Sequence, residues 1–362
     1  MPTRPLVTSY AQDLKLFPDR WHHIGLALGV AVLALYPFAA NDEWLTVANL
    51  TWTAVIGSVA LMIVTGFAGQ ISLGHAAFLA LGAYTAAICG NEWGLPFWLV
   101  LPTAGALAAG VGLAVGVFAL RLKGLYLAIV TLGLVFLVNH VLLSLPEWTG
   151  GLGGISVPMY VWFAPEGGAE LSLEQEYYLL GIDLTFERQM YFVYLLIAVA
   201  VTWMTKNIQR SDTGRAMMAV RDQDLAAAAL GVNPARAKVL AFGISSFFAG
   251  VAGAMFAWQQ QYITVDPPFN LFLSVQYIAM IVLGGIGSVF GAVVGAVAFT
   301  TITPLAESVG PGLPLVSRLT TSQQSTVLFS LLVLVFLIFE PLGLHGIWLR
   351  IKRYFLAWPF SY

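Results

Sequence analysis

Charged side chains are scarce in this sequence. Lys and Arg number 16 and Asp and Glu 18 among 362 residues, or 9% of the chain, against roughly 25% in a typical soluble domain. A soluble fold could not cover its surface with so few charges, and a hydrophobic fraction of 59% excludes a disordered chain. Because a membrane-spanning helix needs about 20 apolar residues, the composition predicts an all-α, polytopic integral membrane protein.

Residues that perform catalysis or hold metals are also scarce. Cys89 is the single cysteine, which excludes disulfides and thiolate metal clusters, and the 5 histidines form no HExxH pair. No Gly-Lys dipeptide occurs, so the phosphate-binding loop GxxxxGK[ST] is absent. A net charge of −2 gives no electrostatic case for nucleic acid. We therefore expect no enzyme, no metal, no cofactor and no nucleic-acid partner.

Charges are nearly absent inside the apolar runs as well, although Glu340 lies near the inner end of the last one. Proton pumps and ion-coupled carriers usually keep acidic or basic side chains along the path of the solute. If the chain moves a solute uphill, we therefore expect the energy to come from another subunit.

Ten apolar runs follow one another along the chain. They cover 24–40, 45–66, 71–90, 96–120, 125–145, 190–205, 237–262, 271–283, 287–305 and 325–345. We interpret each as a membrane segment, although the first also has the length of a signal-peptide core. Gly284-Gly285-Ile286-Gly287-Ser288 interrupts the stretch 271–305 and predicts two segments joined by a tight turn. The alternative is eight crossings plus a re-entrant pair.

Basic and acidic residues gather in different loops. Six basic residues lie between positions 206 and 238, and seven acids lie in 146–189. Basic loops stay in the cytoplasm, so both termini are predicted to be cytoplasmic. The predicted division is a cytoplasmic segment 1–22, a membrane domain 23–345 with a periplasmic loop 146–189 and a cytoplasmic loop 206–236, and a cytoplasmic tail 346–362. The acidic loop either docks a periplasmic partner or only excludes positive charge.

The cytoplasmic loop carries the signals of a short helix. Ser211 or Asp212 can cap its start, an alanine-rich stretch favours helix, and Gly231 suits a left-handed stop. Asn233-Pro234 then begins the next helix. The pattern predicts an amphipathic helix between two spans, which is either a solvated surface helix or a docking helix for a cytoplasmic partner.

Glycine-rich motifs stand in a fixed order along the chain. They are Gly66-Phe67-Ala68-Gly69-Gln70-Ile71-Ser72-Leu73-Gly74-His75, Gly82-Ala83-Tyr84, Arg121-Leu122-x-Gly124-x-Tyr126, Thr131-Leu132, Thr149-Gly150-Gly151, Gly214-Arg215 with Arg221-Asp222, Gly284-Gly285-x-Gly287-Ser288 and Pro341-x-Gly343-Leu344. Together with Asp224-x-Ala226-Ala227-x-x-Leu230-Gly231, this set resembles the M-type permease subunit of the branched-chain (hydrophobic) amino-acid ABC transporter family.

The resemblance implies a division of labour within a bacterial inner membrane. A periplasmic binding protein delivers a branched-chain or other hydrophobic amino acid, this chain and an H-type permease form the path, and two cytoplasmic ATPase subunits supply the energy. The residues implied in ATPase coupling are Gly214, Arg215, Arg221, Asp222, Asp224, Ala226, Ala227 and Gly231. The alternatives are a permease of the same family for urea, amides or aromatic amino acids, and a stand-alone facilitator or ion-coupled carrier.

The motif at 66–78 mixes glycines with polar residues inside apolar flanks. Small residues there either pack helices together or break a helix so that backbone N–H groups face the solute. In the second case the helix N-terminus favours a substrate carboxylate. The predicted residues of the path are Gln70, Ser72, His75, Thr131, Thr149 and Gly150. Glycines at four-residue spacing predict helix–helix contacts, within the chain or with a partner permease, at Gly112, Gly116, Gly287, Gly291 and Gly295.

Overall fold

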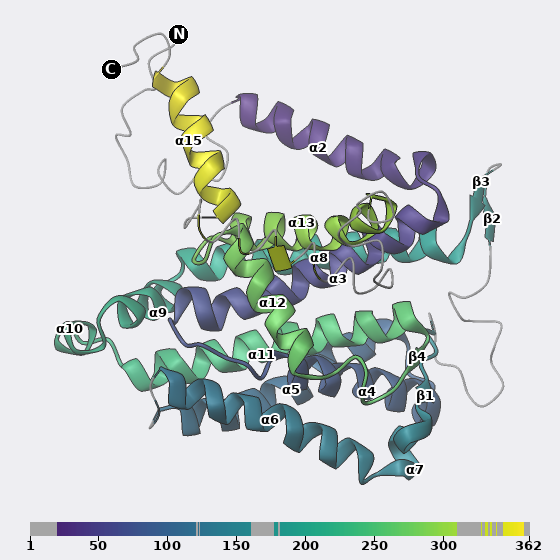
Figure 1. Cartoon of the computed structure of the whole chain (residues 1–362), viewed down its shortest axis with the longest axis horizontal. Coiled ribbons are helices and arrows are strands. Elements are labelled where there is room, and N and C mark those ends of the chain that lie inside the picture. The colour runs from purple at the N-terminus through teal and green to yellow at the C-terminus, as the bar shows by residue number, and fades with distance from the viewer. Residues whose placement is uncertain are drawn as a thin grey trace. The chain divides into compact units, whose positions relative to one another are not determined.

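The computed structural model describes residues 20–120, 122, 124–160, 177–179, 182–309, 327, 330–331, 334, 338 and 343–357. The chain divides into two compact units, residues 1–45 and 46–362. Most of the described residues in each unit are helical (Figure 1).

The described residues of the first unit form one apolar helix and the start of the next. α2 (Arg20–Ala39) presents exposed side chains such as Leu28 and Leu35, which a lipid surface accommodates. After α2, the Asn41 side chain accepts a hydrogen bond from the N–H of Trp44 at 3.2 Å and so caps the following helix. α2 coincides with the first predicted membrane segment.

Long helices build the second unit. They are α3 (Asp42–Met62) with the π-helix η1 (Ile63–Phe67), α4 (His75–Trp93), α5 (Phe97–Ala119), α6 (Leu125–Leu143), α8 (Phe186–Arg210), α11 (Pro234–Gln260), α12 (Leu271–Gly284), α13 (Val289–Val309) and α15 (Gly343–Ala357). Short elements join them: α7 (Pro146–Thr149), η2 (Gly151–Gly153), β1 (Ile155–Ser156), β2 (Tyr177–Leu179), β3 (Ile182–Leu184), α9 (Asp212–Asp222), α10 (Asp224–Ala229) and β4 (Tyr262–Ile263). β1 pairs antiparallel with β4, and β2 with β3.

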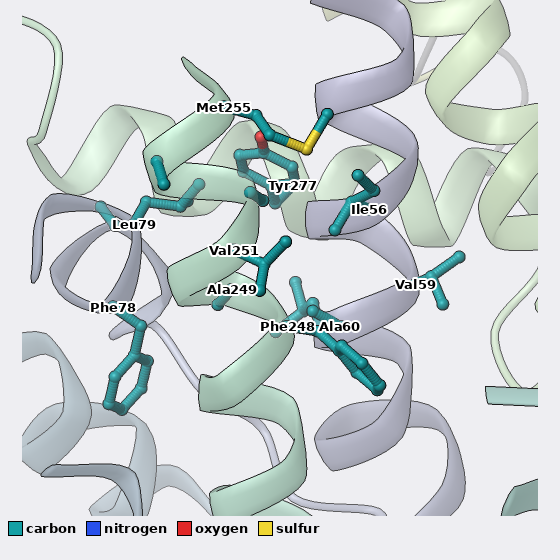
Figure 2. Packing of buried hydrophobic residues seen from close by; sticks show 14 of the residues in the cluster. Ile56, Val59, Ala60, Phe78, Leu79, Phe248, Ala249, Val251, Met255 and Tyr277 are labelled. Atoms are coloured by element: carbon teal, nitrogen blue, oxygen red, sulfur yellow. The ribbon is translucent and has the colours of Figure 1, made fainter. Parts of the chain in front are cut away.

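α11 lies at the centre of the second unit and packs on both α4 and α5 (Figure 1). Figure 2 shows part of the core, in which Phe248, Val251 and Met255 of α11 lie among side chains of α3, α4 and α12. Small residues allow the close approach, because a Cβ atom at Gly82 of α4 would overlap the backbone of Gly250 of α11.

Several helices have the length and composition of membrane spans. Among the described residues they are Asp42–Phe67, Phe97–Phe118, Leu125–Leu143, Phe186–Arg210 and Pro234–Gln260. Leu271–Gly284 and Val289–Ile302, taken together, count as a sixth, and they bend by 118° at the glycine turn. The chain is therefore an all-α, multi-pass membrane protein. Most of the predicted segment 325–345 lies outside the described residues, so the count of ten and the cytoplasmic termini stay predictions.

Two local features differ from the sequence prediction. The loop at 206–236, predicted to be cytoplasmic, contains two helices, α9 and α10, rather than one, because Gln223 between them is extended at φ −160° and ψ 103°. α8 begins at Phe186, so Glu187 lies on a helix and not in the predicted loop 146–189. The earlier part of that loop carries α7, η2 and β1, and the predicted tail 346–362 begins inside α15.

Candidate functional site

The span formed by α3 and η1 ends in a break before α4. The N–H of Gln70 donates to the carbonyl of Val64 at 3.0 Å, which closes the last turn of the π-helix. Gly69 then adopts a φ of +66°, a left-handed conformation that favours glycine. The chain stays irregular until His75 begins α4. The glycine-rich motif at 66–78 therefore does interrupt the helix.

Side chains from two other helices satisfy the backbone at the start of α4. The N–H of Leu73 donates to the Thr131 hydroxyl of α6 at 2.9 Å, and the N–H of Ala76 donates to the Ser274 hydroxyl of α12 at 2.9 Å. The first N–H groups of a helix have no partner within the helix. In this structure, these two groups bind α6 and α12 rather than facing an open path.

The three path residues predicted at the break have different surroundings. Gln70 is 6% exposed, and within the described part of the chain neither atom of its side-chain amide has a hydrogen-bond partner. His75 is buried, and its ring lies 4.8 Å from that of Tyr277 in an edge-on arrangement. The Ser72 hydroxyl accepts from the N–H of Gly74 at 3.3 Å, so it supports the turn.

The structure does not bring all six predicted path residues together. Thr131 lies in the second turn of α6, whereas Thr149 follows the far end of that helix, and the intervening helix spans about 18 Å. The Thr149 hydroxyl donates to the carbonyl of Leu142 at 2.7 Å, and Gly150 ends α7 with a φ of +71°. The residues gathered at the break are Gln70, Ser72, His75 and Thr131.

The predicted capping residues of the cytoplasmic loop take up their expected positions. The Ser211 side chain accepts from the N–H of Gly214 at 3.3 Å at the start of α9. Gly231 follows α10 with a φ of +87°. The Asn233 side chain accepts from the N–H of Arg236 at 3.1 Å and caps α11. The loop is therefore an ordered structure.

Ion pairs fasten the two short helices. Arg215 pairs with Asp212 on the exposed surface of α9. Asp224 at the start of α10 accepts a hydrogen bond from the Lys238 ammonium of α11 at 2.8 Å, and both side chains are largely covered. Asp224 therefore positions α10 on α11.

Two leucines of the cytoplasmic loop project away from the chain. Leu225 is 79% exposed and Leu230 is 86% exposed, while Ala226 is exposed and Ala227 is buried. These leucines were not predicted as a surface. Their signal was their position in α10 and directly after it, because a helix as short as Asp224–Ala229 has little core for an apolar side chain to enter.

Arg221 contacts the end of η1. One of its guanidinium nitrogens, Nη1, donates to the carbonyl of Gly66 in η1 at 2.8 Å, and Asp222 pairs with the same guanidinium at 2.8 Å. The prediction grouped Arg221 with residues that engage an ATPase, but the structure places it against the break. A cavity of about 400 Å³, lined among others by Gln70 and Lys238, lies beside this contact.

The turn between α12 and α13 meets the same region. The N–H of Gly287 donates to the sulfur of Met62 at 3.1 Å. Gly287 has a φ of +93° and lies in the turn, so it does not present the helix face that its spacing predicted. A Cβ atom at Gly343 would lie 2.7 Å from the backbone nitrogen of Gly285, so the start of α15 also packs on this turn.

The other glycines selected for packing lie between helices of this chain. Gly291 and Gly295 approach α12, and Gly112 and Gly116 approach α11, so closely that an added Cβ atom would press on the facing helix. Their contacts are therefore internal to the second unit.

A polar cluster joins three helices at the end of α8 that is remote from α9. The Glu187 carboxylate accepts from the Asn49 side-chain amide of α3 at 2.7 Å and from the Gln259 amide of α11 at 3.0 Å. Both amide groups are buried. Sequence analysis counted Glu187 among the loop acids. Its position in the first turn of a helix, where acids are favoured, was the available signal.

Comparison with known proteins adds independent findings. Residues 44–339 match the family described as branched-chain amino acid transport system / permease component. The high-affinity branched-chain amino acid transport system permease protein LivM of Escherichia coli is 37% identical over 74% of this chain and 65% of its own length. Its counterpart LivH is 31% identical over 42% of this chain and 46% of its own.

A more distant relative is the autoinducer 2 import system permease protein LsrC of Salmonella paratyphi B, 26% identical over 76% of this chain and 75% of its own length. No solved structure matches the chain. The family match covers the break, the cytoplasmic loop and the glycine turn. The chain therefore belongs to the family of permease components of branched-chain amino acid transport systems, as a member of its M type.

Proposed function

We propose that the chain is one of two permease subunits of an ATP-driven importer in a bacterial inner membrane. A periplasmic binding protein delivers the solute, an H-type permease completes the path, and two ATPase subunits act on the cytoplasmic loop 206–236. Similarity to both LivM and LivH supports a pair of related permeases. The six basic residues at 206–238 support the cytoplasmic position of this loop.

The proposed cargo is a branched-chain or other hydrophobic amino acid. The 37% identity to LivM supports this cargo over any other. A cargo of another kind, such as urea, an amide or an aromatic amino acid, is the second candidate. Its support is that LsrC, named for autoinducer 2 import, resembles the chain over a similar length at 26% identity.

We assign the path to the region of the break. Gln70 supports this assignment, because a buried amide without partners can bind a polar solute. His75 lies at the start of α4 beside it. Thr131 and Ser72 hold the backbone of the break in position. Thr149 and Gly150 belong instead to the proposed outer mouth, together with the acidic loop.

The observation that carries the proposal is the apolar surface of Leu225 and Leu230 on a loop that is anchored to the membrane helices. We propose that an ATPase subunit covers these two side chains when it docks on the loop. Hydrophobic burial of one leucine contributes about 2 kcal/mol, so an aspartate at either position opposes docking strongly.

The test is copurification of the ATPase subunits with L225D and L230D variants of the full complex. We expect each variant to retain less than about a tenth of the ATPase, because about 1.4 kcal/mol corresponds to a tenfold change in affinity. Leu152 is the control, since it is 90% exposed at the far end of the helices, and L152D should copurify the ATPase normally. Normal copurification by both loop variants would reject the docking assignment.

A further inference from the structure

Two arginines of α9 have different roles in the structure. Arg215 remains on the surface, where it pairs with Asp212 and donates to the carbonyl of Arg210 at 2.7 Å. Arg221 turns inward and donates to the carbonyl of Gly66 at 2.8 Å. Arg221 and Gly66 are separated by 155 positions in the sequence. The contact therefore joins the cytoplasmic loop directly to a membrane helix.

The acceptor of this bond is a group that the break leaves without a helical partner. Gly66 lies in the last turn of η1, and the carbonyl groups at the end of a helix lack N–H donors within it. The same end carries the negative pole of the helix dipole, which favours a cation. The Arg221 guanidinium supplies both a donor and a positive charge at this point.

The stem of Arg221 packs on the break itself. A Cβ atom at Gly69 would lie 2.6 Å from Cγ of Arg221 and 3.2 Å from its Cβ. Glycine is therefore needed at position 69 both for its φ of +66° and for this approach. Asp222 holds the guanidinium from the exposed side, with its carboxylate accepting from Nε at 2.9 Å.

The same guanidinium lies near the second break, the turn at 285–288. The position of a Cβ atom on Gly287 lies 3.4 Å from Nη1 of Arg221. The N–H of Gly287 donates to the sulfur of Met62, one residue before η1 begins. η1, the turn at 285–288 and Arg221 thus meet at one point, although they come from three distant parts of the chain.

We propose that Arg221 transmits the movement of α9 and α10 to both helix breaks and so ties ATP hydrolysis to opening of the path. This inference rests on the proposed function of the chain as an ATP-driven permease. Regular helices resist distortion, whereas breaks without a continuous hydrogen-bond ladder absorb it as hinges do. Arg221 donates to the carbonyl of Gly66 at the first break and lies near the second, so displacement of α9 acts where the backbone can change. Arg221 is a positioning residue and does not touch the solute.

The test compares solute uptake per ATP hydrolysed in the reconstituted complex carrying R221A with that of the unmodified complex. We expect R221A to keep the ATPase bound and active while uptake per ATP falls by about tenfold, a common size for coupling between sites. R221K keeps a donor and the charge but loses the planar fork. Its uptake per ATP should therefore lie between that of R221A and that of the unmodified complex. K352A removes an exposed cation of α15 and should keep the ratio within about twofold.

A second variant approaches the contact from the other side. G69A places a methyl group against the Arg221 stem, so it should also lower uptake per ATP, and the double variant should lose less than the two single losses combined. Unchanged uptake per ATP in both R221A and G69A overturns the inference. If R221A does not assemble, G69A alone decides. Absence of ATP-dependent uptake in the unmodified complex rejects the proposed function instead.

Discussion

Individual polar side chains in this protein serve the backbone at places where membrane helices are interrupted. Thr131 and Ser274 accept from N–H groups at the start of α4, and Arg221 donates to a carbonyl at the end of η1. Lipid offers no substitute partner, and an unsatisfied backbone group there costs several kcal/mol. These side chains therefore fix the geometry of the break.

The sequence predicts such residues only when donor and acceptor are close along the chain. Ser211 and Asn233 were predicted as caps because the groups that they bind lie three residues away. Ser274 lies 198 positions from its partner, and Glu187 lies 138 positions from Asn49. Such contacts depend on how the helices pack, which no local pattern in the sequence encodes.

Glu187 provides a prediction at this scale. Replacement by alanine removes the carboxylate that accepts from the buried amides of Asn49 and Gln259, and leaves Asn49 only the backbone carbonyl of residue 187, so we expect E187A to destabilise the protein by about 2 kcal/mol. E187Q should lower the free energy of unfolding by less than E187A does. Asn49 and Gln259 can turn their side-chain oxygens to accept from the glutamine amide. Thermal unfolding in detergent measures both, with E92A at an exposed position as the control. An unfolding midpoint for E187A equal to that of E92A would contradict the account.

Whole helices were predicted more completely than their contacts. Apolar runs give the order and approximate extent of the long helices α3, α4, α5, α6, α8, α11, α12 and α13, because each span must be apolar over most of its length. The glycine motif likewise predicts the turn between α12 and α13. The division of the loop helix at Gln223 was not predicted, because the residue favours no particular break and its extended backbone reflects the docking of α9 and α10 on other helices.

Packing between elements is tested by two glycines of α5. A Cβ atom at Gly112 would lie 3.0 Å from the carbonyl of Phe242 and overlap Ser246, whereas one at Gly110 would meet nothing within 4 Å. We expect G112A to destabilise the protein by about 2 kcal/mol through strain at the α5–α11 contact. G110A should be neutral or stabilising, since alanine favours helix by about 1 kcal/mol. Thermal unfolding in detergent measures both variants, and equal midpoints would reject this packing.

At the scale of the whole molecule, polar chemistry is concentrated at a few points. The family match begins at residue 44, close to the division between the two units, and includes the break and the cytoplasmic loop. The described spans carry few charges along their length, and Leu225 and Leu230 are exposed on the loop 206–236. This arrangement agrees with the proposed function, in which other proteins supply the energy and the solute.

The most direct test is uptake of labelled leucine by proteoliposomes that contain this chain, its H-type partner and the two ATPases. We predict uptake that requires both ATP and the periplasmic binding protein, and that unlabelled isoleucine and valine suppress while urea and acetamide do not. Equal uptake without ATP, or by this chain alone, would contradict the account.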